Sequence, residues 1–420
     1  MKTQERTEFA QHWKLVMAAS IGFAFSSIVS TSTGLFMEPL GEEFGWGRAL
    51  TASGASITAA FTFLMSPFFG AMIDRWGTRW MALFGTAFAG VLIAGFSLSN
   101  GSPWLWVLMW TVYALGAVMI KSTVWTAAVS SVFTTGRGLA LGLTLSGTAV
   151  AQAIIPPLTN SLIDNYGWRG AFVCLGLGGG AIAFLACYFF LFDGYASARQ
   201  RRASAENIGS ANSATSEKIL LDVPGLSIAE AKRSPALQKI AVTTFIMMVI
   251  TIALNIHQFE ILRSTGLSRT DAAYLSSIAG IAGVVGKLVT GWLLDRYHAR
   301  WVGGITLAVS SIAFALLMLP NLTTTLILIA MMINGYTAGT KLQVTSYLIS
   351  AYGGMRNFGA IFGVIASLIA AGSGLGPVLA GYTYDTFGSY NPFLIAGIIG
   401  SLMCGLLIAS LSDYPNWKRS

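Results

Sequence analysis

The chain has 420 residues, of which 54% are hydrophobic and only 10% are charged, and its mean hydropathy is +0.67. A soluble domain carries about 25% charged residues, so this composition excludes an ordinary soluble protein and predicts a membrane protein. About 20 apolar residues cross a bilayer as a helix, so the length allows about a dozen spans joined by short loops.

The first dozen residues, MKTQERTEFAQH, are polar, and no small-residue cleavage site follows the first apolar stretch. This pattern predicts a first span that stays in the membrane, in contrast to a signal peptide, which is removed. Beyond it, apolar stretches separated by charges or by Gly and Pro predict eleven more spanning helices. The twelve predicted spans are 13–37, 49–72, 79–99, 104–133, 138–163, 169–192, 238–262, 271–294, 301–319, 323–352, 358–384 and 391–412.

A polar stretch, residues 193–237, separates the sixth span from the seventh and contains ARQRRASAENIGSANSATSEK. Its composition predicts a cytoplasmic linker, and its end, GLSIAEAKRSPALQK, predicts a short amphipathic helix on the membrane surface. The predicted organisation is therefore an N-terminal bundle over 1–192, the linker, and a C-terminal bundle over 238–420.

The basic residues are distributed unevenly across the predicted membrane. If the N-terminus is cytoplasmic, 18 of the 25 Lys and Arg residues lie on the cytoplasmic side. Cytoplasmic loops carry an excess of Lys and Arg, so both termini are predicted to be cytoplasmic. The net charge of +8 then reflects topology, and no nucleic-acid partner is needed to explain it. Four basic residues fall outside, Arg48, Arg169, Arg263 and Arg269, and three fall within spans, Lys121, Lys287 and Lys341.

The two halves of the sequence repeat with an offset of 221 residues. The offset predicts two pseudo-symmetric six-helix bundles, all-α, in parallel repeat, with a binding site at their interface near the midplane. Matched pairs include Gly70 with Gly291, Asp74 with Asp295, Arg75 with Arg296, Arg79 with Arg300, Gly138 with Gly359, Gly142 with Gly363 and Asp164 with Asp385.

The segment GAMIDRWGTR (70–79) resembles the G-x-x-x-D-R-x-G-x-R/K signature of the major facilitator superfamily. GWLLDRYHAR (291–300) resembles a weaker second copy, with His298 where glycine is usual. EEFGWGRAL (42–50) and GLSIAEAKRS are similar to segments of the monocarboxylate porter and oxalate/formate antiporter branch. The resemblance implies a twelve-helix secondary transporter and not an enzyme. In that branch a cation in span 8 binds the substrate carboxylate, and Lys287 occupies its place where arginine is usual.

Three lysines lie inside predicted spans, where a cation at the helix centre costs about 2.5–3.5 kcal/mol. Lys121 and Lys341 are expected near mid-bilayer, and Lys287 lies somewhat nearer the cytoplasm. The acidic residues of the spans, such as Glu38 and Glu260, fall near the outer ends. The lysines therefore predict an anionic substrate, and the alternative is a structural role.

Lys121 and Lys341 are 220 residues apart, one short of the repeat offset, so they are expected to face each other across the cavity. The resemblance implies that spans 1, 4, 7 and 10 line the cavity, and helical periodicity shows which of their residues share a face with the lysines. These residues are further candidates, with ordinary helix packing as the alternative for each. The predicted substrate-binding residues are Lys121, Lys287, Lys341, Trp110, Trp125, Asn334, Thr345, Asn255, Gln258 and Ser30.

Two other roles are predicted. The resemblance implies that the two signature clusters clamp the cytoplasmic helix ends in one conformational state, although positive-inside anchoring accounts equally well for Arg79 and Arg300. The predicted gating residues are Gly70, Asp74, Arg75, Arg79, Asp295 and Arg296. The candidates for proton coupling are His257, Glu38 and Glu260, with a satisfied interfacial side chain as the alternative for each.

The sequence thus predicts a secondary active transporter that moves a small mono- or dicarboxylate, including aromatic ones, by alternating access with proton symport. Anion exchange, drug or metabolite export and a transport-inactive sensor are the alternatives. No cofactor is expected, and the scattered His and Cys residues predict no metal site. The expected setting is the cytoplasmic membrane of a bacterium, with the protein as a monomer in contact with lipid.

Overall fold

The computed structural model describes residues 3–46, 48–192, 225–264, 269–319 and 323–415. Within these ranges the chain is helical, apart from one isolated β-type pairing between Gly225 and Gly354. The first group of helices is α1 (Thr3–Phe25), α2 (Ile28–Phe44), α3 (Arg48–Trp76), α4 (Thr78–Gly95), α5 (Pro103–Met119), α6 (Ser122–Ser130), α7 (Arg137–Val173) and α8 (Gly179–Phe190). The second is α10 (Ile228–Arg233), α11 (Pro235–Ser264), α12 (Arg269–Leu294), α13 (Ala299–Leu317), α14 (Thr324–Tyr352), α15 (Phe358–Phe387) and α16 (Asn391–Ala409).

Nine stretches of the described residues are long and apolar enough to cross a membrane. One of them, Arg137–Phe190, turns at Gly167, whose φ of 68° only glycine adopts readily, and so makes two passes. The helices α12 and α14, which are not among the nine, supply the remaining two of the twelve expected spans. The predicted all-α membrane fold is confirmed.

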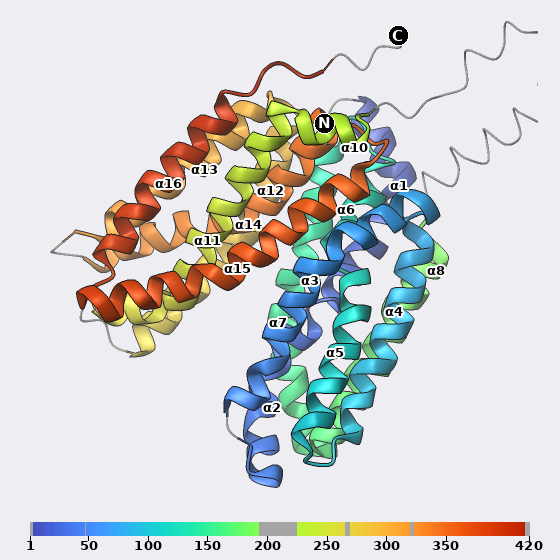
Figure 1. Ribbon diagram of the computed structural model, residues 1–420. Coiled ribbons are helices and arrows are strands. Elements are labelled where there is room, and N and C mark those ends of the chain that lie inside the picture. The colour runs from blue at the N-terminus through green and yellow to red at the C-terminus, as the bar shows by residue number, and fades with distance from the viewer. Residues whose placement is uncertain (1–2, 47, 193–224, 265–268, 320–322, 416–420) are drawn as a thin grey trace, which may run out of the picture.

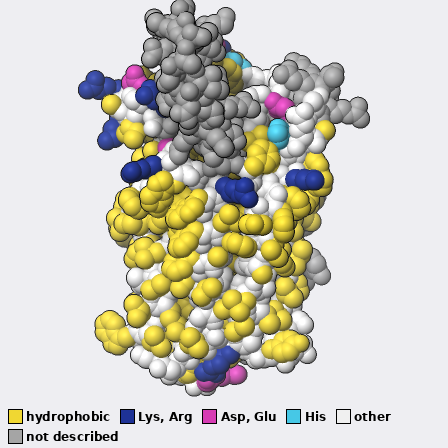
Figure 2. All heavy atoms as spheres, turned by 90° about the vertical axis from the view of Figure 1, so that its right-hand side faces the viewer, with side chains coloured by type: hydrophobic (Ala, Val, Ile, Leu, Met, Phe, Trp, Pro, Cys, Tyr) yellow, Lys and Arg dark blue, Asp and Glu magenta, His cyan; other side chains and the backbone are white. Residues whose placement is uncertain are grey.

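The helices form two bundles that approach each other at the end where both termini lie and diverge toward the opposite end (Figure 1). Helices α1 to α8 make one bundle, and α11 to α16 make the other. The face in Figure 2 carries a broad band of hydrophobic side chains, with Lys and Arg concentrated above it and a small charged group below. This distribution suits a lipid belt with the convergent end in the cytoplasm.

Two predicted spans differ from the expectation of continuous helices. The first, 13–37, bends at Ser26 and Ser27, between α1 and α2. The fourth, 104–133, breaks at Ile120 and Lys121, between α5 and α6. Backbone breaks at membrane depth are tolerated where protein or a cavity surrounds them, and both breaks meet that condition.

The linker prediction falls largely on residues 193–224, which lie outside the described ranges. The amphipathic helix expected after it is the short α10. A capping box starts α10, because the side chains of Ser227 and Glu230 each accept a hydrogen bond from the other residue's backbone N–H. The Leu226 N–H donates to the carbonyl of Gly353, which ties this segment to the end of α14.

Two carboxylates join the bundles at their cytoplasmic ends. Asp74, in the last turn of α3, accepts hydrogen bonds from the backbone N–H groups of Gly359 and Ala360, both at 2.8 Å, at the start of α15. Asp295, after α12, accepts from Gly138 and Leu139 at 2.6 and 2.8 Å, at the start of α7. The first N–H groups of a helix have no partner within it and favour a negative charge, so each carboxylate caps a helix of the opposite bundle.

Glycines let the bundles approach closely beside these caps. A Cβ at Gly70 would collide with the Gly359 carbonyl, and a Cβ at Gly291 would collide with that of Gly138. The 221-residue repeat relates these two contacts to each other, because Gly70 matches Gly291 and Gly138 matches Gly359. The cytoplasmic closure is therefore pseudo-symmetric, with one copy between α3 and α15 and the other between α12 and α7.

We predict that replacing both capping carboxylates, Asp74→Ala with Asp295→Ala, shifts the chain toward states closed on the outer side. Hydrogen bonds to a charged group contribute about 1.5–3 kcal/mol each, so the population ratio is expected to change by at least tenfold. Spin labels at Asn165 and Thr386, exposed near the outer ends of the two bundles, report the change as a shorter distance.

The labels require a background without the exposed Cys174. Asp413→Ala is the control, because Asp413 pairs with Arg300 within the C-terminal bundle at 3.0 Å. An unchanged distance distribution in the double variant would contradict the assignment of the caps.

Candidate functional site

Two cavities lie between the bundles. The first, here named the Lys287 cavity, has a volume of about 280 Å³ and is lined by α7 on one side and α11, α12 and α14 on the other. The second, the Lys121 cavity, has a volume of about 300 Å³ and lies between α2, α3, α5, α6, α15 and the bend that precedes α2. Each is lined by residues of both bundles, as expected for a site at the repeat interface.

Lys287 crosses from one bundle to the other. Its Nζ donates to the carbonyl of Leu145 at 2.9 Å and lies 3.4 Å from Oγ1 of Thr148, both on α7. Gly142 makes room for this approach, because a Cβ there would collide with the Lys287 carbonyl. The ammonium therefore has neutral oxygen partners, and no Asp or Glu is among the described residues that line this cavity.

Four carboxamides complete the Lys287 cavity. The Asn334 amide nitrogen donates to Oδ1 of Asn255 at 3.2 Å and to Oε1 of Gln258 at 3.3 Å, as the network assigns these amides. Asn255 and Gln258 thereby turn their amide oxygens toward Asn334 and keep their NH₂ groups as donors at the cavity. Gln152 lines it from α7. An ammonium with several amide donors is suited to bind a carboxylate.

The Lys121 cavity is built at a helix break. Lys121 precedes α6 with an extended backbone, ψ 175°, so its side chain and the first turn of α6 reach the same cavity. Gly85 on α4 makes room for the bend, because a Cβ there would collide with Ile120. Discontinuous helices place partial charges at the ends of their halves, and the N-terminus of α6 favours an anion.

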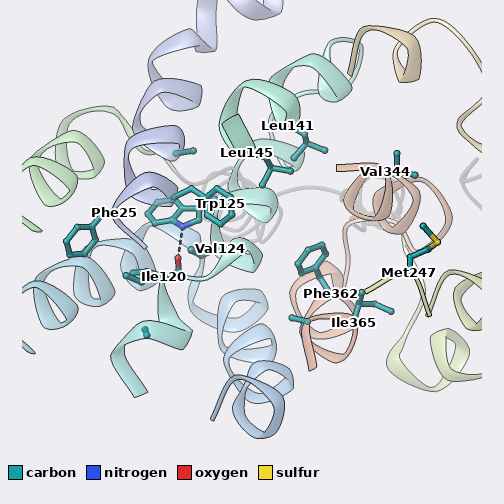
Figure 3. Close-up of a cluster of buried hydrophobic side chains, with 14 of the residues drawn as sticks. Phe25, Ile120, Val124, Trp125, Leu141, Leu145, Met247, Val344, Phe362 and Ile365 are labelled. Carbon is teal, nitrogen blue, oxygen red and sulfur yellow. Dashed lines mark hydrogen bonds between the residues drawn. The ribbon is translucent and has the colours of Figure 1, made fainter. Parts of the chain in front are cut away.

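Trp125 was expected in the cavity but lies elsewhere. It is fully buried, and its indole N–H donates to the Ile120 carbonyl at 2.8 Å (Figure 3). The ring packs against Gly22 on α1. Trp125 thus satisfies a carbonyl that the helix break frees, and Trp110 is the tryptophan that lines the cavity.

Hydroxyl groups cover much of the Lys121 cavity wall. Ser30 lines it, as expected, and its hydroxyl donates to the Ser27 carbonyl at 2.9 Å. Thr33, Thr58 and Thr62 line it in the same way and also donate within their own helices. These groups present oxygen lone pairs, so the charged donor of the cavity is Lys121 itself.

Lys341 does not face Lys121 across one cavity. Its side chain is 3% exposed and lines a separate space of about 10 Å³ inside the C-terminal bundle, between α11, α13, α14 and α16. Thr345 lies there too, with its hydroxyl 3.2 Å from that of Thr244. The one-residue difference from the repeat offset explains the discrepancy, because one residue rotates a helical side chain by about 100°. The repeat partner of Lys341 is Ile120, and that of Lys121 is Leu342.

His257, the proton-coupling candidate in the described part of the chain, has partners on both ring nitrogens. Its Nε2 lies 3.0 Å from the Pro377 carbonyl and its Nδ1 lies 3.1 Å from the Tyr390 hydroxyl. A carbonyl only accepts, so Nε2 donates and Nδ1 accepts from the hydroxyl in the neutral ring. The side chains of Glu38 and Glu260, the other two candidates, lie outside the described part.

The predicted gating residues are divided between two kinds of contact. Asp74 and Asp295 bridge the bundles, whereas Arg79 donates to the Tyr188 carbonyl within its own bundle at 2.9 Å. Arg296 follows the end of α12, and its guanidinium carbon lies 4.2 Å from the ring centroid of Trp292 on that helix, whereas Arg75 is exposed.

His298, the unusual residue of the second signature copy, stacks on Tyr414 with 4.0 Å between ring centroids. Burial, together with the charge of Arg300, lowers the pKa of His298. The histidine therefore holds the segment after α16 against the cytoplasmic end of α13, a contact that glycine would not make.

Several lining residues are not among those predicted from the sequence, including Tyr113, Thr58, Thr148 and Gln152. Tyr113 follows Trp110 by three residues and so shares its helix face, a signal that helical periodicity contains. The others lie on α3 and α7, which contribute to the lining besides the expected spans.

The sequence profile of the Major Facilitator Superfamily matches residues 19–260 and 240–419. Monocarboxylate transporter 13 of Rattus norvegicus is 27% identical over 412 residues, covering 94% of this chain and 88% of that protein. Monocarboxylate transporter 12 of Mus musculus is 24% identical over 417 residues, covering 94% and 85%. The resemblance drawn from GAMIDRWGTR and EEFGWGRAL is confirmed.

Two solved structures share the fold. The human organic anion transporter MFSD10 (TETRAN) has a TM-score of 0.69 at 16% identity, covering 94% of this chain and 99% of that chain. The proton:xylose symporter XylE, bound to 6-bromo-6-deoxy-D-glucose, has a TM-score of 0.67 at 13% identity, covering 93% and 94%.

We predict that Trp125→Phe destabilises the protein more than Trp110→Phe does. Both changes remove the same atoms, but Trp125 donates a buried hydrogen bond, whereas no partner of the Trp110 indole N–H is present among the described residues. Leaving the Ile120 carbonyl unsatisfied is expected to add about 1–3 kcal/mol to the cost of Trp125→Phe. Unfolding in mixed micelles measures both variants, and equal losses would contradict a supporting role of the bond.

Proposed function

Because this chain belongs to the major facilitator superfamily and is a membrane transporter, not an enzyme, we propose that its solute is a small organic anion. The proposed substrates are mono- or dicarboxylates. The observation that carries the proposal is the Lys287 cavity, where an ammonium and amide donors meet between the bundles without a carboxylate among the described lining residues. The names of the relatives, monocarboxylate transporters, and of one fold neighbour, an organic anion transporter, support it.

The proposed transport cycle uses alternating access. The Asp74 and Asp295 caps hold the cytoplasmic ends together while the anion enters from the outer side. A bound carboxylate competes with the Leu145 carbonyl for the Lys287 ammonium. That competition weakens the hydrogen bond between Lys287 on α12 and Leu145 on α7. The Asp295 cap, which joins the same two helices, is then lost, and the cytoplasmic side opens.

Proton symport is the proposed coupling, with His257 as the residue that carries the proton. Tyr390 can accept a hydrogen bond as well as donate one, so protonated His257 keeps both of its partners. Exchange of one anion for another is the second candidate. It is favoured by the lysine at each cavity and by the carboxamides of the Lys287 cavity, because these groups bind an anion directly.

The protein is a multi-pass membrane protein, and its solute is small. A bacterial cytoplasmic membrane and a monomeric state stay proposals, since the relatives named above come from Rattus norvegicus and Mus musculus.

We predict that Lys287→Gln lowers carboxylate uptake into proteoliposomes at least tenfold, because a charge-assisted hydrogen bond to the anion is lost. The measurement is initial uptake across a panel of radiolabelled mono-, di- and aromatic carboxylates. Lys239→Gln is the control, since Lys239 bonds to Ser410 at the cytoplasmic surface, away from both cavities. Unaltered uptake by Lys287→Gln for every transported substrate would exclude this lysine as the binding cation.

We predict that an outside-acid pH gradient accelerates uptake by the wild type, and that His257→Gln removes the acceleration while retaining uptake without a gradient. Glutamine replaces the hydrogen bonds of His257 but takes up no proton near neutral pH. Preloading the vesicles with unlabelled carboxylate tests the second candidate. Acceleration by preloading, with none from the pH gradient, would indicate anion exchange instead of symport.

A further inference from the structure

The two cavities are repeats of each other. Seven of the residues that line the Lys121 cavity become lining residues of the Lys287 cavity when the 221-residue offset is applied. Tyr113 becomes Asn334, Thr62 becomes Gly283, and Ser373 of α15 becomes Gln152 of α7. The repeat therefore supplies two equivalent hollows, one on each side of the pseudo-twofold axis between the bundles.

The two lysines are not repeats of each other. Lys121 belongs to the break between α5 and α6, and its repeat partner on α14 is Leu342. Lys287 belongs to α12, and its repeat partner on α3 is Ser66. Each hollow has thus acquired one cation of its own, from a different helix, and neither has an Asp or Glu among its described lining residues.

The Lys121 cavity contains a lysine side chain as well as the start of a helix. The Lys121 side chain lines it, and so does Ser122, the first residue of the nine-residue α6. No partner of the Lys121 ammonium or of the Ser122 backbone N–H is present among the described residues, whereas the ammonium of Lys287 already has two. An ammonium and a free amide N–H at the positive end of a helix are two donors for one carboxylate.

The other lining residues differ in polarity between the Lys287 cavity and the Lys121 cavity. The Lys287 cavity has carboxamides at its wall, whereas the Lys121 cavity has Trp110, Tyr113, Val29 and Ile369, with hydroxyls whose protons are used within their own helices. Aromatic and branched side chains favour an apolar group, and the ammonium beside them favours a charged one. Their combination fits a carboxylate attached to an apolar body of aromatic size.

We propose that the Lys121 cavity is a second carboxylate site, separate from the one at Lys287, and that it binds a monocarboxylate with an apolar, aromatic-sized body. The carboxylate lies between the Lys121 ammonium and the start of α6, and the body lies against Trp110 and Tyr113. The chain then holds two anions at once, a hydrophilic one at Lys287 and an apolar one at Lys121. The assignment of the Lys287 site rests on the proposed function, whereas the Lys121 site stands on its own geometry.

Calorimetric titration of the purified chain in lipid nanodiscs tests the proposal with phenylacetate and glycolate as probes. Both probes are expected to bind the wild type, and saturating glycolate is expected to leave the phenylacetate affinity within twofold. Lys121→Gln is expected to weaken phenylacetate at least tenfold and to spare glycolate, and Lys287→Gln is expected to do the reverse. Each variant is the matched control for the other.

Lys121→Arg keeps the charge and is expected to keep phenylacetate binding, which separates a lost ligand contact from a lost fold. Mutual displacement of the two probes on the wild type would overturn the proposal, and that measurement needs no variant. Undiminished phenylacetate affinity in folded Lys121→Gln would overturn it as well. A different result would contradict the proposed function alone. In that case carboxylate uptake is absent, while phenylacetate still binds the wild type and Lys121→Gln still weakens that binding.

Discussion

The arrangement of the whole molecule depends on two carboxylates that each cap a helix of the opposite bundle. Asp74 and Asp295 accept four backbone hydrogen bonds between them, at helix ends where the N–H groups have no other helical partner. Because these contacts lie at one end of the bundles, they close that end and leave the other free to diverge (Figure 1). The two cavities lie between the bundles that these caps join.

The three lysines of the membrane-spanning part lie in three different environments. Lys287 donates to a carbonyl and a hydroxyl of the other bundle, Lys121 lies at a helix break beside a cavity, and Lys341 is enclosed within its own bundle near Thr345. A cation inside a membrane is costly unless it meets polar partners or a cavity. Lys121 and Lys287 line the inter-bundle cavities and Lys341 does not, so depth in the membrane alone does not identify a candidate binding residue.

The sequence predicted the spans, the repeat and the family because these features depend on local composition and spacing. Hydropathy marks a span without reference to its neighbours, and the Asp–Arg spacing of GAMIDRWGTR repeats 221 residues later. The break at Lys121 was not predictable, because no Gly or Pro occurs in AVMIKSTV and the break depends on tertiary contacts, with Gly85 of α4 making room for it and the Trp125 side chain folding back onto the Ile120 carbonyl. Lys341 was misplaced because one residue of register changes which face of a helix a side chain occupies.

The 221-residue repeat is kept at the cytoplasmic contacts and broken at the cavity lysines, and these two regions have different proposed roles. The cytoplasmic caps and glycines keep the repeat, which fits the proposed alternating access, because a rocking motion would release the same kind of contact in both bundles. The cavities keep the repeat in shape but not in charge, since Lys121 faces one hollow and Lys287 the other. The repeat is therefore kept at the contacts proposed to open and close, and it is broken at the lysines proposed to bind the substrate.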